Sequence, residues 1–128
     1  MTKTHSLNNI ETIMVHENRW TWGKTASIVI ADGAAIVDMS FEDDNPGVCY
    51  ISGLSVVPWK RRQGLATNLM EECEYYCIKR GIFRIDLNSV QEPFVMDFYH
   101  KLGYTDIKEN DGCMRMFKML YKPPFKPI

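Results

Sequence analysis

A basic turn between an apolar strand and an amphipathic helix is the segment of this sequence best suited to chemistry. Positions 56 to 67 read Val-Val-Pro-Trp-Lys-Arg-Arg-Gln-Gly-Leu-Ala-Thr. The first backbone N–H groups of a helix have no intrahelical partner and lie at the positive end of the helix dipole, so they attract anions. Gly64 leaves the backbone unobstructed, and the guanidinium groups of Arg61 and Arg62 suit phosphate oxygens. The segment predicts a phosphate-binding turn.

Two common phosphate-binding motifs do not fit this turn. The P-loop needs G-x-x-x-x-G-K-[ST], but Gly64 is followed by Leu65, Ala66 and Thr67, without the second glycine or the lysine. The dinucleotide fingerprint G-x-G-x-x-G lacks its glycines as well. An arginine pair in a turn is by default a solvated basic surface. Its place beside a glycine, after a strand and before a helix, favours phosphate binding instead.

Residues 61–66 resemble the [QR]-x-x-G-x-[GA] pyrophosphate loop of the GCN5-related N-acetyltransferases, the GNAT family. The preceding strand, residues 51–58, is similar to the family strand that ends in V-x-P. About thirty residues later, positions 98–104 read Phe-Tyr-His-Lys-Leu-Gly-Tyr, which is similar to the family signature F-Y-x-[KR]-x-G-[FY]. The two motifs have the expected order and separation. The resemblance is specific over residues 48–107 and loose over residues 24–41.

This resemblance implies an acetyl-coenzyme A site. The backbone of Leu54 and Val56 would pair with the pantetheine arm, and the amides of residues 62–67 would hold the pyrophosphate. The implied cofactor-binding residues are Leu54, Val56, Arg61, Arg62, Gln63, Gly64, Leu65, Ala66, Thr67 and Tyr99. Tyr99 aligns with the catalytic tyrosine that protonates the departing thiolate, a transfer that a phenol can perform. The alternative is an ordinary core tyrosine on an amphipathic helix.

Two positions depart from the family pattern. Many relatives have Asn and Ala seven and four residues before the tyrosine, where this chain has Glu92 and Val95. Glu92 either places a carboxylate near the acceptor or, more simply, is a helix N-terminal acid favoured by the dipole. The sequence identifies no general base. The candidates are Asp38 and the acidic residues 42–44, a loop that would suit a cationic amine if it lay on the acceptor side.

Composition predicts one small domain spanning residues 1–128. The chain is 45% hydrophobic, enough for one substantial core, and its net charge of −1 gives no basic field for nucleic acid or an anionic membrane. No apolar run approaches the roughly 18 residues of a membrane span, and the N-terminus has no apolar signal-peptide core. We therefore expect a cytoplasmic protein.

The four cysteines are too scattered for a disulfide framework. Cys73 and Cys77 lie four residues apart on one helical face and could form half of a metal site. No histidine or second cysteine pair is spaced to complete it, so the favoured interpretation is buried packing. We expect free thiols and no metal.

Hydrophobic periodicity orders the elements as β-β-β-α-β-α-β-β. Strands are predicted over residues 24–30, 34–41, 48–57, 82–88, 104–107 and 113–121. One helix begins at Leu65 and ends before Gly81, and another begins at Pro93 and ends before Gly103. The fold class is α/β (α+β), with a mixed, mostly antiparallel sheet and helices packed against it. The resemblance adds a central parallel strand pair that splays apart.

The region before residue 24 is short for this family, which usually places one or two helices between its first two strands. At most residues 10–20 precede the first hairpin here, too few for two full helices at 1.5 Å rise per residue. We expect an open acceptor groove that a second subunit completes in a homodimer. Trp20 and Trp22 would either lie in that interface or cap the core of the hairpin, and both remain open.

The sequence thus predicts an acetyl-coenzyme A-dependent N-acetyltransferase that transfers acetyl to a primary amine by direct attack. The acceptor is a small molecule or a peptide, which the motifs do not distinguish. Two alternatives remain. One is a catalytically idle coenzyme A-binding regulatory module, favoured by the missing Asn. The other is a nucleic-acid-binding domain that uses Lys60, Arg61 and Arg62, which the near-neutral net charge disfavours.

Overall fold

The computed structural model describes residues 2–7, 11–58, 61 and 64–121, which form one mixed sheet with two helices. In chain order the elements are β1 (Thr2–Leu7), β2 (Glu11–Arg19), β3 (Gly23–Ile30), the 3₁₀ turn η1 (Ala31–Gly33), β4 (Ala35–Glu42), β5 (Val48–Val56), α1 (Leu65–Lys79), β6 (Arg84–Val90), α2 (Pro93–Lys101), β7 (Thr105–Asn110) and β8 (Cys113–Met119).

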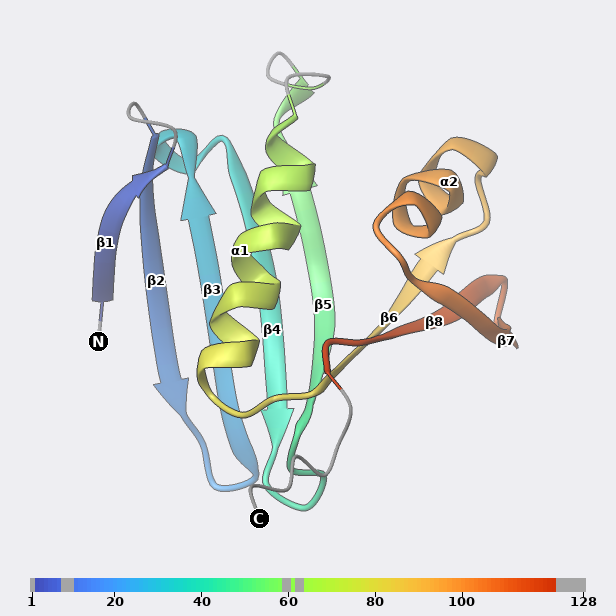
Figure 1. Ribbon diagram of the computed structural model, residues 1–128, viewed down its shortest axis with the longest axis horizontal. Helices are drawn as coiled ribbons and strands as arrows, with labels where there is room; N and C mark the ends of the chain where they lie inside the picture. Colours follow the sequence, from blue (N-terminus) through green and yellow to red (C-terminus); the bar gives the residue numbers. More distant parts are fainter. Residues whose placement is uncertain (1, 8–10, 59–60, 62–63, 122–128) are drawn as a thin grey trace.

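The sheet has eight strands in the order β1-β2-β3-β4-β5-β6-β8-β7 (Figure 1). Its neighbouring strands are antiparallel except for β5 and β6, which are parallel and joined through α1. α1 lies across β3, β4 and β5, whereas α2 packs against β6. This arrangement confirms the predicted fold class.

The core lies between α1 and the sheet. Alternate residues of β3 and β4 are buried, as expected for strands with one face against a helix. From α1 the core receives side chains at three- and four-residue spacing: Leu65, Leu69, Met70, Cys73, Tyr76 and Cys77. Each fully buried aliphatic side chain contributes about 1.5–3 kcal/mol, so this face fixes α1 firmly on the sheet.

The N-terminal prediction was wrong in one respect. The predicted element order began with a strand at residue 24, but β1 and β2 precede it as antiparallel strands beside β3. Ile13 and Val15 are buried while Met14 between them is 37% exposed, so the side chains follow the period of two of a strand. Val15 pairs with Ile28 of β3, and this contact with the core determines the strand conformation.

Neither α1 nor α2, the two α-helices of the described residues, has the length and apolar character of a membrane span.

Candidate functional site

The two parallel strands at the centre of the sheet pair over only part of their length. Residues 48–51 of β5 pair with residues 84–87 of β6. Beyond them β5 continues to Val56 beside β4, and β6 continues to Val90 beside β8. The strands therefore diverge, as predicted, and β6 carries α2 away from β5 (Figure 1).

A β-bulge marks the place where the strands part. Asp38 of β4 pairs with Gly53, but the next residue, Met39, pairs with Ile51, so Ser52 is an extra residue in β5. Such a bulge bends its strand and increases its twist. Because Ile51 is the last residue of β5 that pairs with β6, the bend begins where that pairing stops.

Leu54 and Val56 turn their backbone groups toward the side that β6 has left. The Val57 N–H donates to the carbonyl oxygen of Ala34 at 2.8 Å, and Val56 is the partner of Ala35. In an antiparallel ladder, alternate residues direct both backbone groups to the same neighbour. The backbone groups of Val57 therefore point toward β4, and those of Val56 and Leu54 point away from it. These are the two residues predicted to pair with an extended ligand.

The predicted phosphate turn leads directly into α1. Gly64 has a left-handed backbone (φ 77°), and its carbonyl accepts the first helical hydrogen bond from Asn68 at 3.0 Å. A Cβ built on Gly64 would have no atom within 4 Å, so the space in front of the helix end is open. Leu65 is buried, so it offers only its backbone. Ala66 and Thr67 are half-buried.

Arg61 ties this turn to the end of β5. Its Nε donates to the carbonyl oxygen of Val56 at 3.0 Å, and the side chain is exposed. The guanidinium is therefore anchored at the strand end, and its other N–H groups have no partner in the part of the chain that the structure describes. Of the other predicted residues, Arg62 and Gln63 lie outside the described part of the chain.

Tyr99 lies on α2, largely buried. Its ring contacts Phe98 and Tyr104 edge-on, with ring centroids 5.0 and 5.9 Å away. Burial raises the pKa of Tyr99 above its ordinary value, so the phenol stays protonated at neutral pH. Among the described residues, no side chain forms a hydrogen bond with the Tyr99 hydroxyl. Every fully buried side-chain oxygen or nitrogen in this part of the chain has a hydrogen-bond partner, so the hydroxyl is not fully buried. Tyr99 can therefore donate a proton, although its ring also serves the core.

Asp38 is the candidate base nearest to the bulge. One carboxylate oxygen accepts a 2.6 Å hydrogen bond from the Ser27 hydroxyl. A Cβ on Gly53 would lie 3.3 Å from the other oxygen, so the carboxylate covers Gly53, the neighbour of Leu54. Asp38 lies on the sheet face opposite α1, because its neighbours in β4 are the ones buried beneath the helix.

The acidic loop lies elsewhere. Its Asp43 forms an ion pair with Arg19 just after Glu42, the last residue of β4. This end of β4 is the one farther from Gly64. From Asp38 to Glu42 the strand advances about 13 Å at 3.3 Å per residue. The antiparallel path of β4 therefore carries Asp43 away from the bulge.

Cavities of about 430 and 330 Å³ lie near that loop rather than at Gly64. The smaller one is lined in part by Ser40, Glu42, Tyr50 and Asp86. Tyr50 and Asp86 are a pair in the parallel segment just before the strands part. This cavity is therefore on the same face as Asp38 and includes one acidic loop residue, Glu42. Sequence reasoning missed it because Tyr50 and Asp86 meet only through strand register.

A family model described as "Acetyltransferase (GNAT) domain" matches residues 4–120. The chain belongs to this family. Solved GNAT structures share its fold. The PaiA N-acetyltransferase of Thermoplasma acidophilum, in complex with coenzyme A, has a TM-score of 0.67 at 18% identity, covering 74% of this chain and 60% of its own. The ribosomal-protein-S18-alanine N-acetyltransferase of Escherichia coli has a TM-score of 0.67 at 16% identity, covering 86% and 77%.

An aminoglycoside 6'-N-acetyltransferase complexed with coenzyme A is also similar, with a TM-score of 0.64 at 16% identity and coverage of 78% and 75%. No curated protein matches the chain by sequence. The chain spans 60% of the length of the Thermoplasma protein, so the likeness concerns the shared sheet and helices. At these identities the GNAT neighbours establish the fold of the chain and leave its acceptor open.

Proposed function

We propose that this GNAT protein is an acetyl-coenzyme A-dependent N-acetyltransferase that transfers acetyl to a primary amine by direct attack. The observation that carries the proposal is the divergence of β5 from β6 beside the turn that opens α1. Two similar GNAT proteins were solved with coenzyme A, which supports the same ligand here. We propose one catalytic domain over residues 1–128, in the cytoplasm, where the free thiols of Cys49, Cys73, Cys77 and Cys113 would stay reduced.

The chain fits this ligand at both ends of the proposed site. Leu54 and Val56 offer backbone donors and acceptors for the amides of the pantetheine arm. The open helix end at Gly64 offers amides for the pyrophosphate, and Arg61 adds a cation. The first turn of α1 contains no acidic residue that would repel phosphate. Arg62 and Gln63 complete the predicted set.

When bound, acetyl-coenzyme A supplies an activated acetyl group as a thioester. Asp38 accepts a proton from the attacking amine, directly or through water. The backbone N–H of Leu54 or Val56 donates to the carbonyl oxygen, where negative charge develops. Tyr99 donates a proton to the departing sulfur. One proton is thus taken from the amine and one is given to the thiolate, and no metal takes part.

The acceptor would approach from the face that carries Asp38. Glu42 lines the 330 Å³ cavity on this face, and its carboxylate has no ion-pair partner among the described residues, whereas Asp86 is paired with Arg84 and Arg115. The Glu42 carboxylate favours a cationic acceptor. That acceptor is a small molecule or a peptide whose amine can reach Leu54. We propose a small or peptidic amine that carries a second positive charge.

The alternative is a catalytically idle module that binds coenzyme A. It is favoured by Glu92, which caps α2 through its backbone and replaces the usual Asn. The packing of the Tyr99 ring against Phe98 and Tyr104 is also compatible with a structural role. The position of Asp38 beside the bulge favours the enzyme, and activity measurements separate the two.

Coenzyme A should stabilise the fold through the open helix end at Gly64. At a hundredfold excess over its Kd, a one-site ligand adds about 2.7 kcal/mol, which raises the melting temperature by several degrees. Gly64→Asp should lose this shift and Gly64→Asn should keep most of it. Both residues tolerate the left-handed backbone and differ mainly in charge. Thermal unfolding with and without ligand measures the effect. An unshifted parent protein at millimolar ligand would contradict the assignment.

Tyr99→Phe should separate binding from chemistry. The substitution keeps the ring packing and removes only the hydroxyl, so stability and the shift caused by coenzyme A should change little. Turnover should fall about 100-fold or more, the scale of a lost proton donor. Thiol release with an accepted amine measures turnover. Tyr75→Phe, at an exposed tyrosine of α1, is the matched control. Equal turnover of both variants would assign sulfur protonation to water.

Asp38→Asn should leave the fold intact, because the amide oxygen can still accept from Ser27. Turnover should fall about 10²- to 10⁴-fold, the scale of a lost general base. The measurement is kcat/KM from thiol release with an accepted amine. Asp44→Asn in the acidic loop is the control and should behave like the parent. Equal kcat/KM for Asp38→Asn and the parent would remove Asp38 from the mechanism.

We propose a homodimer in which the exposed tryptophans of the β2–β3 turn contribute to the interface. Trp20 and Trp22 are 49% and 48% exposed, so neither is fully covered by the core of its own chain. Light scattering should give twice the chain mass, and Trp22→Ser should shift the protein toward monomer. Thr21→Ser in the same turn is the control. A monomeric parent with full activity would exclude the dimer as a requirement.

A further inference from the structure

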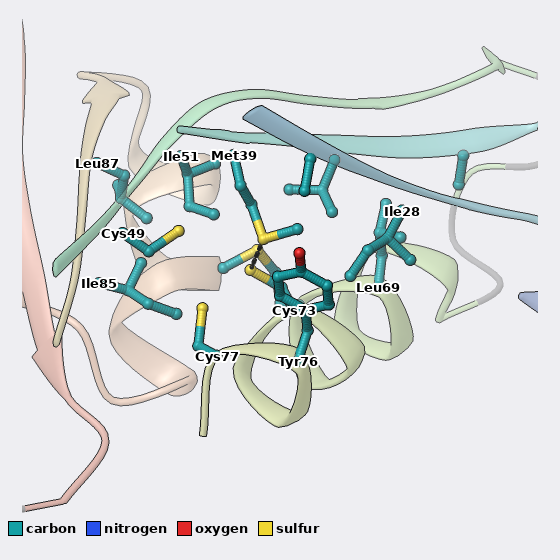
Figure 2. Close-up of a cluster of buried hydrophobic side chains, with 14 of the residues drawn as sticks. Ile28, Met39, Cys49, Ile51, Leu69, Cys73, Tyr76, Cys77, Ile85 and Leu87 are labelled. Carbon is teal, nitrogen blue, oxygen red and sulfur yellow. Dashed lines mark hydrogen bonds between the residues drawn. The ribbon is translucent and has the colours of Figure 1, made fainter. Parts of the chain in front are cut away.

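Three cysteines that the proposed reaction does not use converge in the core. Cys49 comes from β5, and Cys73 and Cys77 come from α1; all three are fully buried. Their sulfur atoms lie within 4.8 Å of one another, and Figure 2 shows them between the helix and the strands. The sequence predicted only the pair on α1 and no ligand to complete it. The third sulfur comes from β5, which only the packing of α1 on the sheet could reveal.

A fourth sulfur borders the cluster. The Sδ of Met39, on β4, is 3.3 Å from the Sγ of Cys73 (Figure 2). No histidine or carboxylate in the described residues joins the three cysteines as a ligand. Figure 2 shows apolar side chains around the cluster, including Ile51, Ile85 and the ring of Tyr76. The donor set is therefore made of sulfur alone, in surroundings that exclude water.

Three charged side chains beside the cysteine cluster carry a net positive charge, which stabilises negative charge on the sulfur atoms. Lys24 and Arg80 both pair with Glu17, at 3.7 and 3.4 Å, which leaves one net positive charge near Tyr76 and Cys77. Hydrogen bonds from the thiols of Cys49 and Cys73, with help from Arg80 and Lys24, lower the pKa of Cys77. Burial raises the pKa of Cys49, and hydrogen bonds with Cys49 and Cys77 raise the pKa of Cys73. A net positive charge therefore lies beside the three sulfur atoms.

We propose that Cys49, Cys73 and Cys77 bind one monovalent copper ion, Cu(I), with the Met39 thioether beside it. Thiolate and thioether ligands select Cu(I) over harder cations. Structural zinc sites use four nitrogen or thiolate ligands in tetrahedral geometry, which this cluster does not offer. Cu(I) bound to two thiolates and a thiol carries one negative charge, which the net charge of Lys24, Arg80 and Glu17 balances.

The cluster needs little movement to close around an ion. Three sulfurs at a metal–sulfur distance of about 2.3 Å would lie about 4 Å from one another. Each thiol that becomes a thiolate ligand releases its proton to solvent, and no electron is transferred because copper enters as Cu(I). The occupied site would join α1 to β5 two residues before Ile51, at the base of the divergence from β6.

The test is an anaerobic titration of the reduced full chain with Cu(I), in competition with the chelator bicinchoninate. The parent should take one copper per chain, with ultraviolet charge-transfer absorption typical of copper–thiolate bonds. Cys49→Ala, Cys73→Ala and Cys77→Ala should each bind at least tenfold more weakly. Cys113→Ala is the matched control and should bind like the parent, because Cys113 is on β8 and outside the cluster.

Two further measurements test the proposal even if a Cys→Ala variant of the core fails to fold. Met39→Leu conserves volume, so it should fold and bind severalfold more weakly. X-ray absorption of the copper-loaded parent should show sulfur ligands only, at about 2.3 Å. The proposal is overturned if the parent fails to compete with the chelator, if Cys113→Ala removes binding, if nitrogen or oxygen ligates the copper, or if Zn²⁺ binds in its place with equal strength.

Discussion

The hydrogen bonding of β5 is the constraint on which the rest of the structure depends. From Tyr50 to Val56, apart from the bulged Ser52, this strand pairs with β4, whereas β6 pairs with its other edge only over residues 48–51. The extra residue Ser52 bends the strand at that boundary. The backbone groups of Leu54 and Val56 then face an edge without a strand partner. Arg61 satisfies the Val56 carbonyl, and the other groups need water or a ligand. An opening inside a continuous sheet is thus produced by the register of one strand.

α1 is fixed at both ends around this opening. At its N-terminus, Arg61 links the preceding turn to the Val56 carbonyl. Near its C-terminus, the Tyr76 hydroxyl donates to Glu17 of β2, which lowers the pKa of that carboxyl, and Arg80 stacks on the Tyr76 ring with a centroid distance of 3.6 Å. These partly buried polar contacts orient the helix, while apolar packing supplies most of the stabilisation. The helix end at Gly64 is therefore held in a defined position relative to β5.

The sequence predicted the elements whose limits depend on local chemistry. Gly64 and Gly81 bound α1, Pro93 begins α2, and the Asp111-Gly112 turn joins β7 to β8 with positive φ at both residues. Features that depend on pairing between distant strands were not predictable. β1 and β2 were missed because their alternation is short, and the bulge at Ser52 leaves no sequence signal. For the site, the motifs identified Tyr99 and the phosphate turn, whose roles remain predictions.

Residues brought together by register show the same limit. Asp38 was one of several candidate acids, and only its pairing with Gly53 distinguishes it from the acidic loop. Cys49 could not be joined to the α1 cysteines, because the spacing of residues along a chain does not say which face of a strand meets which turn of a helix. Tertiary packing, rather than local propensity, determined both results.

The short parallel joint between β5 and β6 also has a consequence for how the chain folds. β1 to β5 each pair with the next strand in sequence, so this half of the sheet consists of local contacts that close small loops. The parallel pairing of β5 with β6 requires the α1 crossover to be in place first. This pairing covers only residues 48–51 of β5, so it contributes few hydrogen bonds. Local pairings form faster than non-local ones. The five-stranded meander is therefore the expected folding nucleus, and the half that carries α2 docks onto it last.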